Sequence, residues 1–263
     1  MNTDRDRSMR KNGRTADIIF AILFILLIAA SCYIFILSTP LGVGLVSDSV
    51  NYINGARSIA AGNGYYRESG GGTLKAITNF PPLYSIVLSL PLKLGMDWLK
   101  AAWWVSLVFF VLNSVLIVRI VWLAGGSRWA GLAAAAMFLC MQPYLYYQFY
   151  AMSEPVYYFC TFLAFIFMLK GFRNSRFDRW FCCGLACGGA FLARYIGIVS
   201  LCAIFGAILI FLRSKRMQAF AGLFCGSLPL IGAWLIRNAL ATGSASNRQI
   251  LSHWVTLDRK SVV

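Results

Sequence analysis

Long apolar segments alternate with short polar, mostly basic segments along nearly the whole chain. The first apolar segment, residues 18–37, is long enough for a helix to cross about 30 Å of hydrocarbon. Six further segments have the same character, and together they predict an all-α integral membrane protein with about seven transmembrane helices: 18–37, 101–123, 129–147, 153–169, 180–193, 196–212 and 217–236.

One stretch allows two interpretations. Residues 180–212 are interrupted only by Arg194, so they can form two short spans or one long tilted helix. Two spans place the basic clusters at residues 170–179 and 213–216 on the same side as the basic N-terminus, as the positive-inside rule requires. We therefore favour two spans.

The same rule gives the predicted topology. Residues 1–17 are basic and cytoplasmic, and the first span is too long for a signal-peptide core, so it stays as an anchor. Residues 18–236 form the transmembrane domain of a multi-pass protein of the inner (plasma) membrane, with residues 38–100 as a long first extracytoplasmic loop. Within this loop residues 83–94 are too short to span and contain a proline, so we expect them in the membrane interface. Residues 237–263 form an extracytoplasmic tail.

Composition agrees with a membrane protein. Apolar residues make up 59% of the chain and charged residues 13%, and the mean hydropathy is +0.69. One soluble core of this length could not bury so much apolar surface. The formal net charge is +15, but the lysines and arginines form short clusters between apolar segments, which is typical of membrane-flanking charges. We therefore expect no nucleic acid partner.

All eight cysteines lie inside apolar segments, where a small polarizable side chain packs well, so we expect no disulfide framework. Cys182, Cys183 and Cys187 are close enough in sequence to suggest metal ligands, but no histidine or carboxylate lies beside them in the sequence except Asp178. Packing is the favoured interpretation, and no metal site is predicted.

A polar segment, residues 47–66, follows the first span and contains Asp48, one of nine acidic residues. At helical spacing Asp48, Tyr52 and Ile59 share one face, and the glycines in residues 62–64 favour the conformation that ends helices. We expect a short helix at the membrane surface that holds one carboxylate over the bilayer. The alternative is a solvated loop with an N-capping serine or aspartate.

Several ionisable residues share the predicted outer face of the membrane. Because ionisable groups at membrane depth are costly, their convergence favours a functional site. The alternative is that each serves its own helix, the arginines as snorkelling anchors and the glutamate as an N-terminal charge. The candidates are Asp48, Arg57, Glu154, Arg194, Arg237 and Asn238.

Five short motifs follow one another in the chain: S-D-x-x-x-Y-x-x-x-A-R-x-x-x-x-G-x-G-Y from Ser47, F-P-P-L-Y from Phe80, S-E-P from Ser153, L-A-R-Y-x-G from Leu192 and I-R-N from Ile236. In this order the motifs resemble the polytopic glycosyltransferases of the GT-C superfamily, in particular the branch of the protein O-mannosyltransferases and lipid A aminoarabinose transferases. The likeness extends over residues 18–245. It implies a GT-C-like fold with juxtamembrane helices in the first outer loop.

The resemblance also implies an activity. Such enzymes transfer a sugar from a polyprenyl-phosphate donor to a protein, lipid or glycan acceptor on the extracytoplasmic side. The aspartate of the first outer loop, which is the catalytic carboxylate in that family, corresponds to Asp48. A carboxylate within hydrogen-bond reach can take the proton of an acceptor hydroxyl as the glycosyl bond forms.

The donor phosphate needs a cation near the headgroup plane, and a guanidinium can hold phosphate oxygens in a bidentate fork. Arg194 and Arg237 are the candidates at the outer ends of the last three spans, and Arg57 is the next candidate. Substrate contacts are expected from three residues of the same segments: Tyr52, Tyr84 and Asn238.

Two features depart from the family pattern. Asp48 is followed by Ser49, where many members carry a second acid, so an acidic pair would need Glu154 instead. Members usually continue for several more spans and often a soluble domain, so a chain ending at Val263 is expected to be a short or truncated member.

Two other functions fit a protein of this kind: a non-catalytic membrane scaffold, and a subunit that translocates lipid-linked sugars. A transporter predicts inverted repeats or helices broken at the midplane, and the sequence shows neither. No cofactor is predicted, and the need for a divalent cation is left open.

Overall fold

The computed structural model describes residues 3–69 and 72–245, and the side chains of residues 15–68 and 72–245. Within these residues the chain is almost entirely helical, with one β-hairpin. The elements are, in order, α1 (Thr3–Ser38), α2 (Ser47–Ala60), β1 (Tyr66–Ser69), β2 (Thr73–Ala76), α3 (Leu83–Lys93), α4 (Trp98–Leu123), α5 (Arg128–Leu139), α6 (Gln142–Gln148), α7 (Glu154–Arg173), α8 (Phe177–Ala193), the 3₁₀ turn η1 (Tyr195–Gly197), α9 (Ile198–Phe211) and α10 (Arg216–Thr242).

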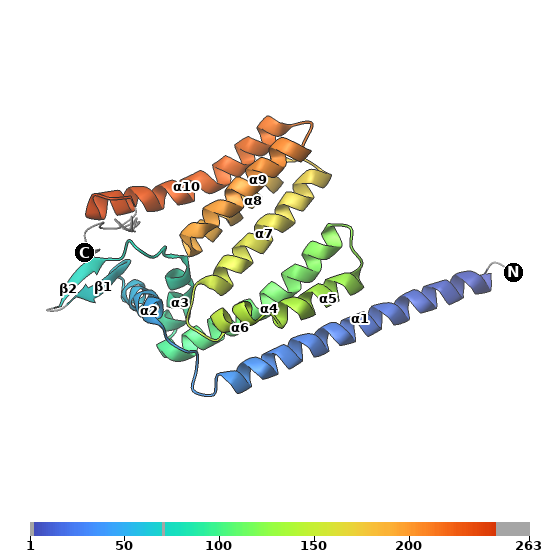
Figure 1. Cartoon of the computed structure of the whole chain (residues 1–263), viewed down its shortest axis with the longest axis horizontal. Helices are drawn as coiled ribbons and strands as arrows, with labels where there is room; N and C mark the ends of the chain where they lie inside the picture. The colour runs from blue at the N-terminus through green and yellow to red at the C-terminus, as the bar shows by residue number, and fades with distance from the viewer. Residues whose placement is uncertain (1–2, 70–71, 246–263) are drawn as a thin grey trace, which may run out of the picture.

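The long helices form a fan whose two ends differ (Figure 1). At one end, here called the N-terminal end, lie the start of α1 and the turns α4–α5, α7–α8 and α9–α10. At the opposite end, here called the α2 end, lie α2, α3 and the hairpin, beside the last turns of α1 and α10. The basic residues in the last turn of α7 therefore share the N-terminal end with the start of the chain.

Four helices of the described chain are long and apolar enough to cross a membrane: Thr15–Ser38, Trp98–Leu123, Glu154–Arg173 and Arg216–Thr242. The other apolar segments form shorter helices. The structure thus agrees with an all-α, multi-pass membrane protein, and the number of seven crossings stays a prediction.

Two predicted segments have internal breaks. The segment 129–147 consists of α5 and α6, because Pro143 lies in the first turn of α6. Proline is favoured there since its missing N–H has no helical partner in the first turn, while its ring disrupts a helix that continues through it. In the segment 180–212, α8 ends at Ala193 and Arg194 is extended, with φ −150° and ψ 138°. This segment therefore forms two helices and not one long one.

The helix predicted in the polar segment is confirmed as α2, which begins at Ser47. Gly62 and Gly64 follow it with φ angles of +82° and +81°, in the left-handed region that glycine adopts without strain. The hairpin that comes next was not predicted. Of the predicted tail, residues 237–242 continue α10, and residues 246–263 lie outside the described residues.

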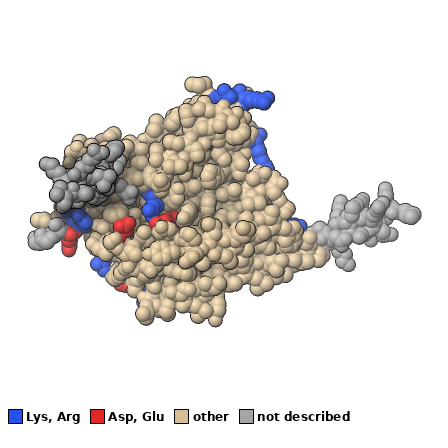
Figure 2. All heavy atoms as spheres, viewed as in Figure 1, with Lys and Arg blue, Asp and Glu red and all other residues tan. Residues whose placement is uncertain are grey.

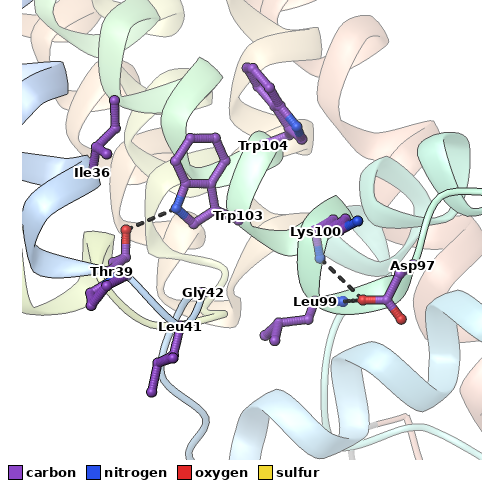
Figure 3. Close-up of a pocket in the computed structure, with 10 residues that line it drawn as sticks. Ile36, Thr39, Leu41, Gly42, Asp97, Leu99, Lys100, Trp103 and Trp104 are labelled. Atoms are coloured by element: carbon purple, nitrogen blue, oxygen red, sulfur yellow. Dashed lines mark hydrogen bonds between the residues drawn. The ribbon is translucent and has the colours of Figure 1, made fainter.

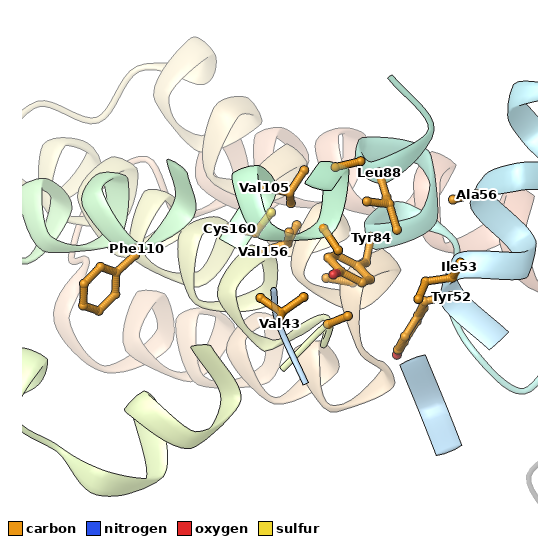
Figure 4. Close-up of a cluster of buried hydrophobic side chains, with 14 of the residues drawn as sticks. Val43, Tyr52, Ile53, Ala56, Tyr84, Leu88, Val105, Phe110, Val156 and Cys160 are labelled. Atoms are coloured by element: carbon orange, nitrogen blue, oxygen red, sulfur yellow. The ribbon is translucent and has the colours of Figure 1, made fainter. Parts of the chain in front are cut away.

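A buried cluster joins the α2 end to the long helices (Figure 4). Tyr84 and Leu88 of α3 are fully buried and lie in one cluster with Tyr52 of α2, Val105 of α4 and Val156 of α7. Burial of a large apolar side chain stabilises by about 1.5–3 kcal/mol. This cluster is what holds the short helices α2 and α3 against α4 and α7.

Helices α8 and α10 approach each other so closely that only glycine fits at two positions. A Cβ atom on Gly184 would lie 2.1 Å from the carbonyl oxygen of Leu223, and one on Gly226 would lie 2.3 Å from that of Phe181. Real Cβ atoms essentially never come this close to other heavy atoms. The backbone contact fixes α8 and α10 relative to each other, and with them the residues at their ends.

We expect Gly226→Ala to lower the free energy of unfolding by about 1–3 kcal/mol, the typical cost of overpacking a core. Gly232→Ala is the matched control, since it lies in the same helix with no heavy atom within 4 Å of the added Cβ. Its effect should be neutral or stabilising by about 0.5–1 kcal/mol, because alanine is the better helix former. Thermal unfolding of the detergent-solubilised protein measures both, and equal effects of the two substitutions would contradict the close contact.

Candidate active site

A backbone contact brings the start of α2 to the start of α7. The amide of Gly44 donates to the carbonyl of Phe149 at 2.8 Å, and the amide of Ala151 donates to the carbonyl of Gly44 at 2.9 Å. A Cβ atom on Gly44 would lie 2.7 Å from the ring of Tyr150, so a larger residue here would force this ring to move. As a result, Asp48 in the first turn of α2 and Glu154 at the start of α7 lie at the same end of the fold.

Glu154 and Arg194 form the central ion pair of this region. Glu154 is only 4% exposed, whereas the side chain of Arg194 is 30% exposed. The pair uses Oε1 of the carboxylate. Its Oε2 is buried and has no hydrogen-bond partner among the described residues. A buried unpaired acceptor costs free energy, so this oxygen can accept a hydrogen bond from a bound molecule.

The sequence explains why Arg194 reaches this position. Helix α8 ends at the residue before it, and the extended conformation of Arg194 separates α8 from η1. The direction of the Arg194 side chain is therefore not set by helical geometry. It meets Glu154 at the N-terminus of α7, where the partial positive charge of the helix end also stabilises the carboxylate.

Two tyrosines line the same region. The hydroxyl of Tyr52 lies 2.9 Å from the hydroxyl of Ser153, and the ring of Tyr52 meets that of Tyr84 edge to face at 5.2 Å. Burial raises the pKa of Tyr52 to about 12, and the nearby carboxylates of Glu154 and Asp48 act in the same direction. Burial also raises the pKa of Tyr84, whose hydroxyl has no hydrogen-bond partner within the described chain. Both tyrosines therefore keep their protons at neutral pH and can serve as hydrogen-bonding groups but not as bases.

Asp48 is the more accessible carboxylate of the region. It is half-buried, and within the described residues it accepts one long hydrogen bond, of 3.5 Å, from the Ser47 hydroxyl. Its charge is close enough to act on both Glu154 and Tyr52. The structure thus brings together Asp48, Glu154, Arg194, Tyr52 and Tyr84.

Arg237 lies at the same end but makes different contacts. Its guanidinium donates to the carbonyl of Ile77 at 2.6 Å and to that of Tyr65 at 2.7 Å. It also lies over the rings of Tyr65, Tyr66 and Trp234 at 5.2–5.8 Å. These contacts bind the two ends of the hairpin to α10.

Tyr195 supports this arrangement, and the sequence analysis did not single it out. Its hydroxyl donates to the carbonyl of Thr78 at 2.7 Å and accepts from the indole of Trp234 at 3.0 Å. Asn238 is fully buried and lies 3.4 Å from the same hydroxyl. The signal was present in the sequence, since Tyr195 and Asn238 each follow a candidate arginine directly.

Arg57 occupies a more peripheral position. Its side chain is exposed and its guanidinium lies 5.3 Å from the ring centre of Trp98, at the start of α4. A cation in the last turn also stabilises the C-terminal end of α2. Both interactions stabilise the end of α2, at the edge of the site region.

A polar cavity of about 170 Å³ lies between α2, the hairpin and the end of α10. Arg67 and Lys75 pair directly across the hairpin, where like charges destabilise a sheet, and no carboxylate lines the cavity. Arg67 also donates to Oδ1 of Asn51 at 2.9 Å. This cavity suits an anion, and Asn51 connects it to the face of α2 that carries Asp48. The sequence did not point to Arg67, because the hairpin was not predicted.

A second hollow of about 440 Å³ lies between the last turn of α1 and the start of α4 (Figure 3). The indole of Trp103 donates to the hydroxyl of Thr39 at 2.8 Å, and Asp97 caps α4 by accepting from the amide of Leu99 at 2.9 Å. None of the candidate residues lines this hollow. We therefore do not count it as part of the site.

Metal ligands are not grouped in the part of the chain that the structure describes, where no cluster of three or more His, Cys, Asp or Glu side chains occurs. Cys183 and Cys187 are buried in α8, and the thiol of Cys183 donates to the carbonyl of Ala164 at 3.4 Å. These contacts are those of packed apolar side chains.

Comparison with known proteins gives one match. A family model described as dolichyl-phosphate-mannose-protein mannosyltransferase matches residues 79–242, which is more than half of the chain. The matched part contains Tyr84, Glu154, Arg194 and Arg237, whereas Asp48 lies before it. No curated protein and no solved structure matches.

The ion pair leads to a stability prediction. Arg194→Ala leaves the buried Glu154 carboxylate without its partner and should lower the free energy of unfolding by about 3–5 kcal/mol. The double substitution Glu154→Leu with Arg194→Met removes both charges and should recover most of this loss. Chemical or thermal unfolding in detergent measures the cycle.

The exposed pair Arg176–Asp178 provides the control. Its two side chains are 62% and 61% exposed, so Arg176→Ala should cost at most about 1 kcal/mol. If the losses of unfolding free energy caused by Glu154→Leu and by Arg194→Met alone simply added up in the double variant, the two side chains would not be coupled as described.

Proposed function

The chain belongs to the family of dolichyl-phosphate-mannose-protein mannosyltransferases, whose members are membrane glycosyltransferases of the GT-C type, and we propose that it transfers a sugar from a polyprenyl-phosphate donor to an acceptor at the α2 end. The observation that carries this proposal is the position of Asp48. It is a half-buried carboxylate beside the pair of Glu154 and Arg194, and the three groups come from separate parts of the chain.

In this proposal Asp48 is the catalytic base. The acceptor hydroxyl attacks the anomeric carbon of the donor and gives its proton to Asp48, while the bond from that carbon to the phosphate oxygen breaks and polyprenyl phosphate leaves. Direct attack opposite the phosphate inverts the anomeric carbon. The first turn of α2 stabilises the negative charge of Asp48 before the transfer, because the helix N-terminus carries a partial positive charge.

Arg194 is the proposed ligand of the donor phosphate. Glu154 binds Nη1 of the guanidinium, and the side chain of Arg194 is 30% exposed. The remaining N–H donors can hold phosphate oxygens and stabilise the charge that grows on the leaving group. Glu154 then acts as a positioning residue that fixes the orientation of Arg194. It is not a second base in this proposal, since its carboxylate is engaged with the arginine.

The other candidates differ in how free they are to meet a substrate. The guanidinium of Arg237 is occupied by backbone carbonyls, so we assign it to holding the hairpin in place of the donor role expected from the sequence. Asn238 has the same supporting role through Tyr195. Tyr52 and the unpartnered hydroxyl of Tyr84 remain proposed substrate contacts.

Asp48→Asn should lower the rate of sugar transfer by about 10²- to 10⁴-fold, because it removes the proton acceptor but keeps the shape of the side chain. The assay uses the purified full chain and a polyprenyl-phosphate sugar, with and without a divalent cation. The matched control is Asp97→Asn, an exposed carboxylate at the same end whose capping role asparagine fulfils equally well.

Normal transfer by Asp48→Asn would remove Asp48 from the mechanism. Absence of transfer by the unmodified chain with every polyprenyl-phosphate sugar tested would favour the non-catalytic scaffold or the translocating subunit as its function.

The side of the membrane on which transfer occurs is a separate prediction. On a cysteine-free background, a cysteine at position 63, after α2, should react with an impermeant thiol reagent in intact cells. A cysteine at position 174, between α7 and α8, should react only after the membrane is opened. Both positions are exposed in the protein, so the reverse labelling pattern would place the proposed site on the cytoplasmic side.

A further inference from the structure

A large apolar cleft separates α1 from α4 and α5 at the N-terminal end. Its volume is about 800 Å³. Only 11% of the most apolar stretch of α1 is buried within the protein. Figure 1 shows α1 at the edge of the fan, next to α5. The cleft is far from the proposed catalytic site at the α2 end. Residues of α1, of α4 and of the start of α5 with the turn before it line the cleft: Asp17, Phe20, Phe24, Val115, Val118, Arg119, Trp122, Gly126, Ser127, Arg128 and Trp129.

The walls of the cleft are apolar. Phe20 and Phe24 of α1 stack with ring centres 6.1 Å apart, and Phe20 meets Trp129 edge to face at 5.8 Å. Val115 and Val118 form the facing wall on α4. Both walls belong to helices long enough to cross a membrane, so an apolar chain is the chemistry that fits between them.

The mouth of the cleft is cationic. Arg128 pairs with Asp17, whereas Arg119 has no carboxylate partner in the described part of the chain and lies 4.5 Å from the ring centre of Trp122. Among the described residues that line the cleft, two arginines and one aspartate leave an excess of one positive charge. Figure 2 shows that the charged side chains on the face in view gather toward the ends of the molecule, with a broad uncharged region between them.

We propose that this cleft binds an anionic glycerophospholipid from the leaflet at the N-terminal end. The acyl chains lie between α1 and α4, and the phosphate lies at the mouth between Arg119 and Arg128. Basic pockets between transmembrane helices are suited to anionic headgroups, and tryptophan is favoured at the depth of the headgroups. The lipid fills the space that the protein leaves open and so joins α1 to the remaining helices.

Native mass spectrometry of the full chain in detergent tests this proposal, with equimolar phosphatidylglycerol and phosphatidylcholine as probes. The unmodified protein should retain phosphatidylglycerol preferentially. Arg119→Gln should reduce its retention about fivefold, the effect of one cation near an anionic lipid. Val115→Trp should also reduce it, because the indole fills the cleft while both arginines stay.

Arg213→Gln is the matched control. It removes the same charge from an exposed residue between α9 and α10, outside the cleft, and should leave the retention unchanged. The proposal is overturned if the two lipids are retained equally, if Arg213→Gln has the effect of Arg119→Gln, or if Val115→Trp retains the lipid normally. A lipid-free dimer that Val115→Trp dissociates would also overturn it, because a second chain would then occupy the cleft.

Discussion

The α2 end depends on one constraint: the buried carboxylate of Glu154 must have a cationic partner. An isolated carboxylate in a medium of low polarity is too costly to stay ionised, so the pair with Arg194 ties the start of α7 to the junction between α8 and α9. The junction can supply the arginine because the helix stops one residue before it. A continuous helix through this segment would hold Arg194 on a helix face, and the extended backbone that carries it to Glu154 would be lost.

Around this pair, backbone contacts position the remaining parts. The contact of Gly44 with Phe149 and Ala151 brings the start of α2 to α7. On the other side, Arg237 binds the backbone on either side of the hairpin to α10. The segment between α1 and α4 is thus attached at two places to parts of the chain that follow it much later in the sequence. Its own secondary structure is short, and these attachments explain how it can hold a carboxylate in a defined place.

Much of the helical framework could be predicted, because apolar length and basic flanks report directly on helices that cross a membrane. The break at Arg194 was favoured because the positive-inside rule called for two spans there. The helix in the polar segment was readable from its spacing and from the glycines that follow it, which are local signals. The hairpin was not readable: its four-residue strands carry charges, and its stability depends on Arg237, 160 residues after Ile77. For the same reason the sequence could place Arg194 and Arg237 at one face but could not distinguish a guanidinium bound to a carboxylate from one bound to backbone carbonyls.

The family match and the geometry support different halves of the proposed site. Glu154 and Arg194 lie within the matched residues, and neither belongs to α2. Asp48 lies before the match, and its position depends on the glycine contact at Gly44 and on the burial of Tyr52 against Tyr84. The half of the site that we propose for the phosphate thus lies at the start of α7 and the end of α8, whereas the half that would take the proton is carried by a segment packed onto these helices. With such a division, a change in the segment between α1 and α4 would alter the proposed acceptor side of the site while leaving the Glu154–Arg194 pair unchanged.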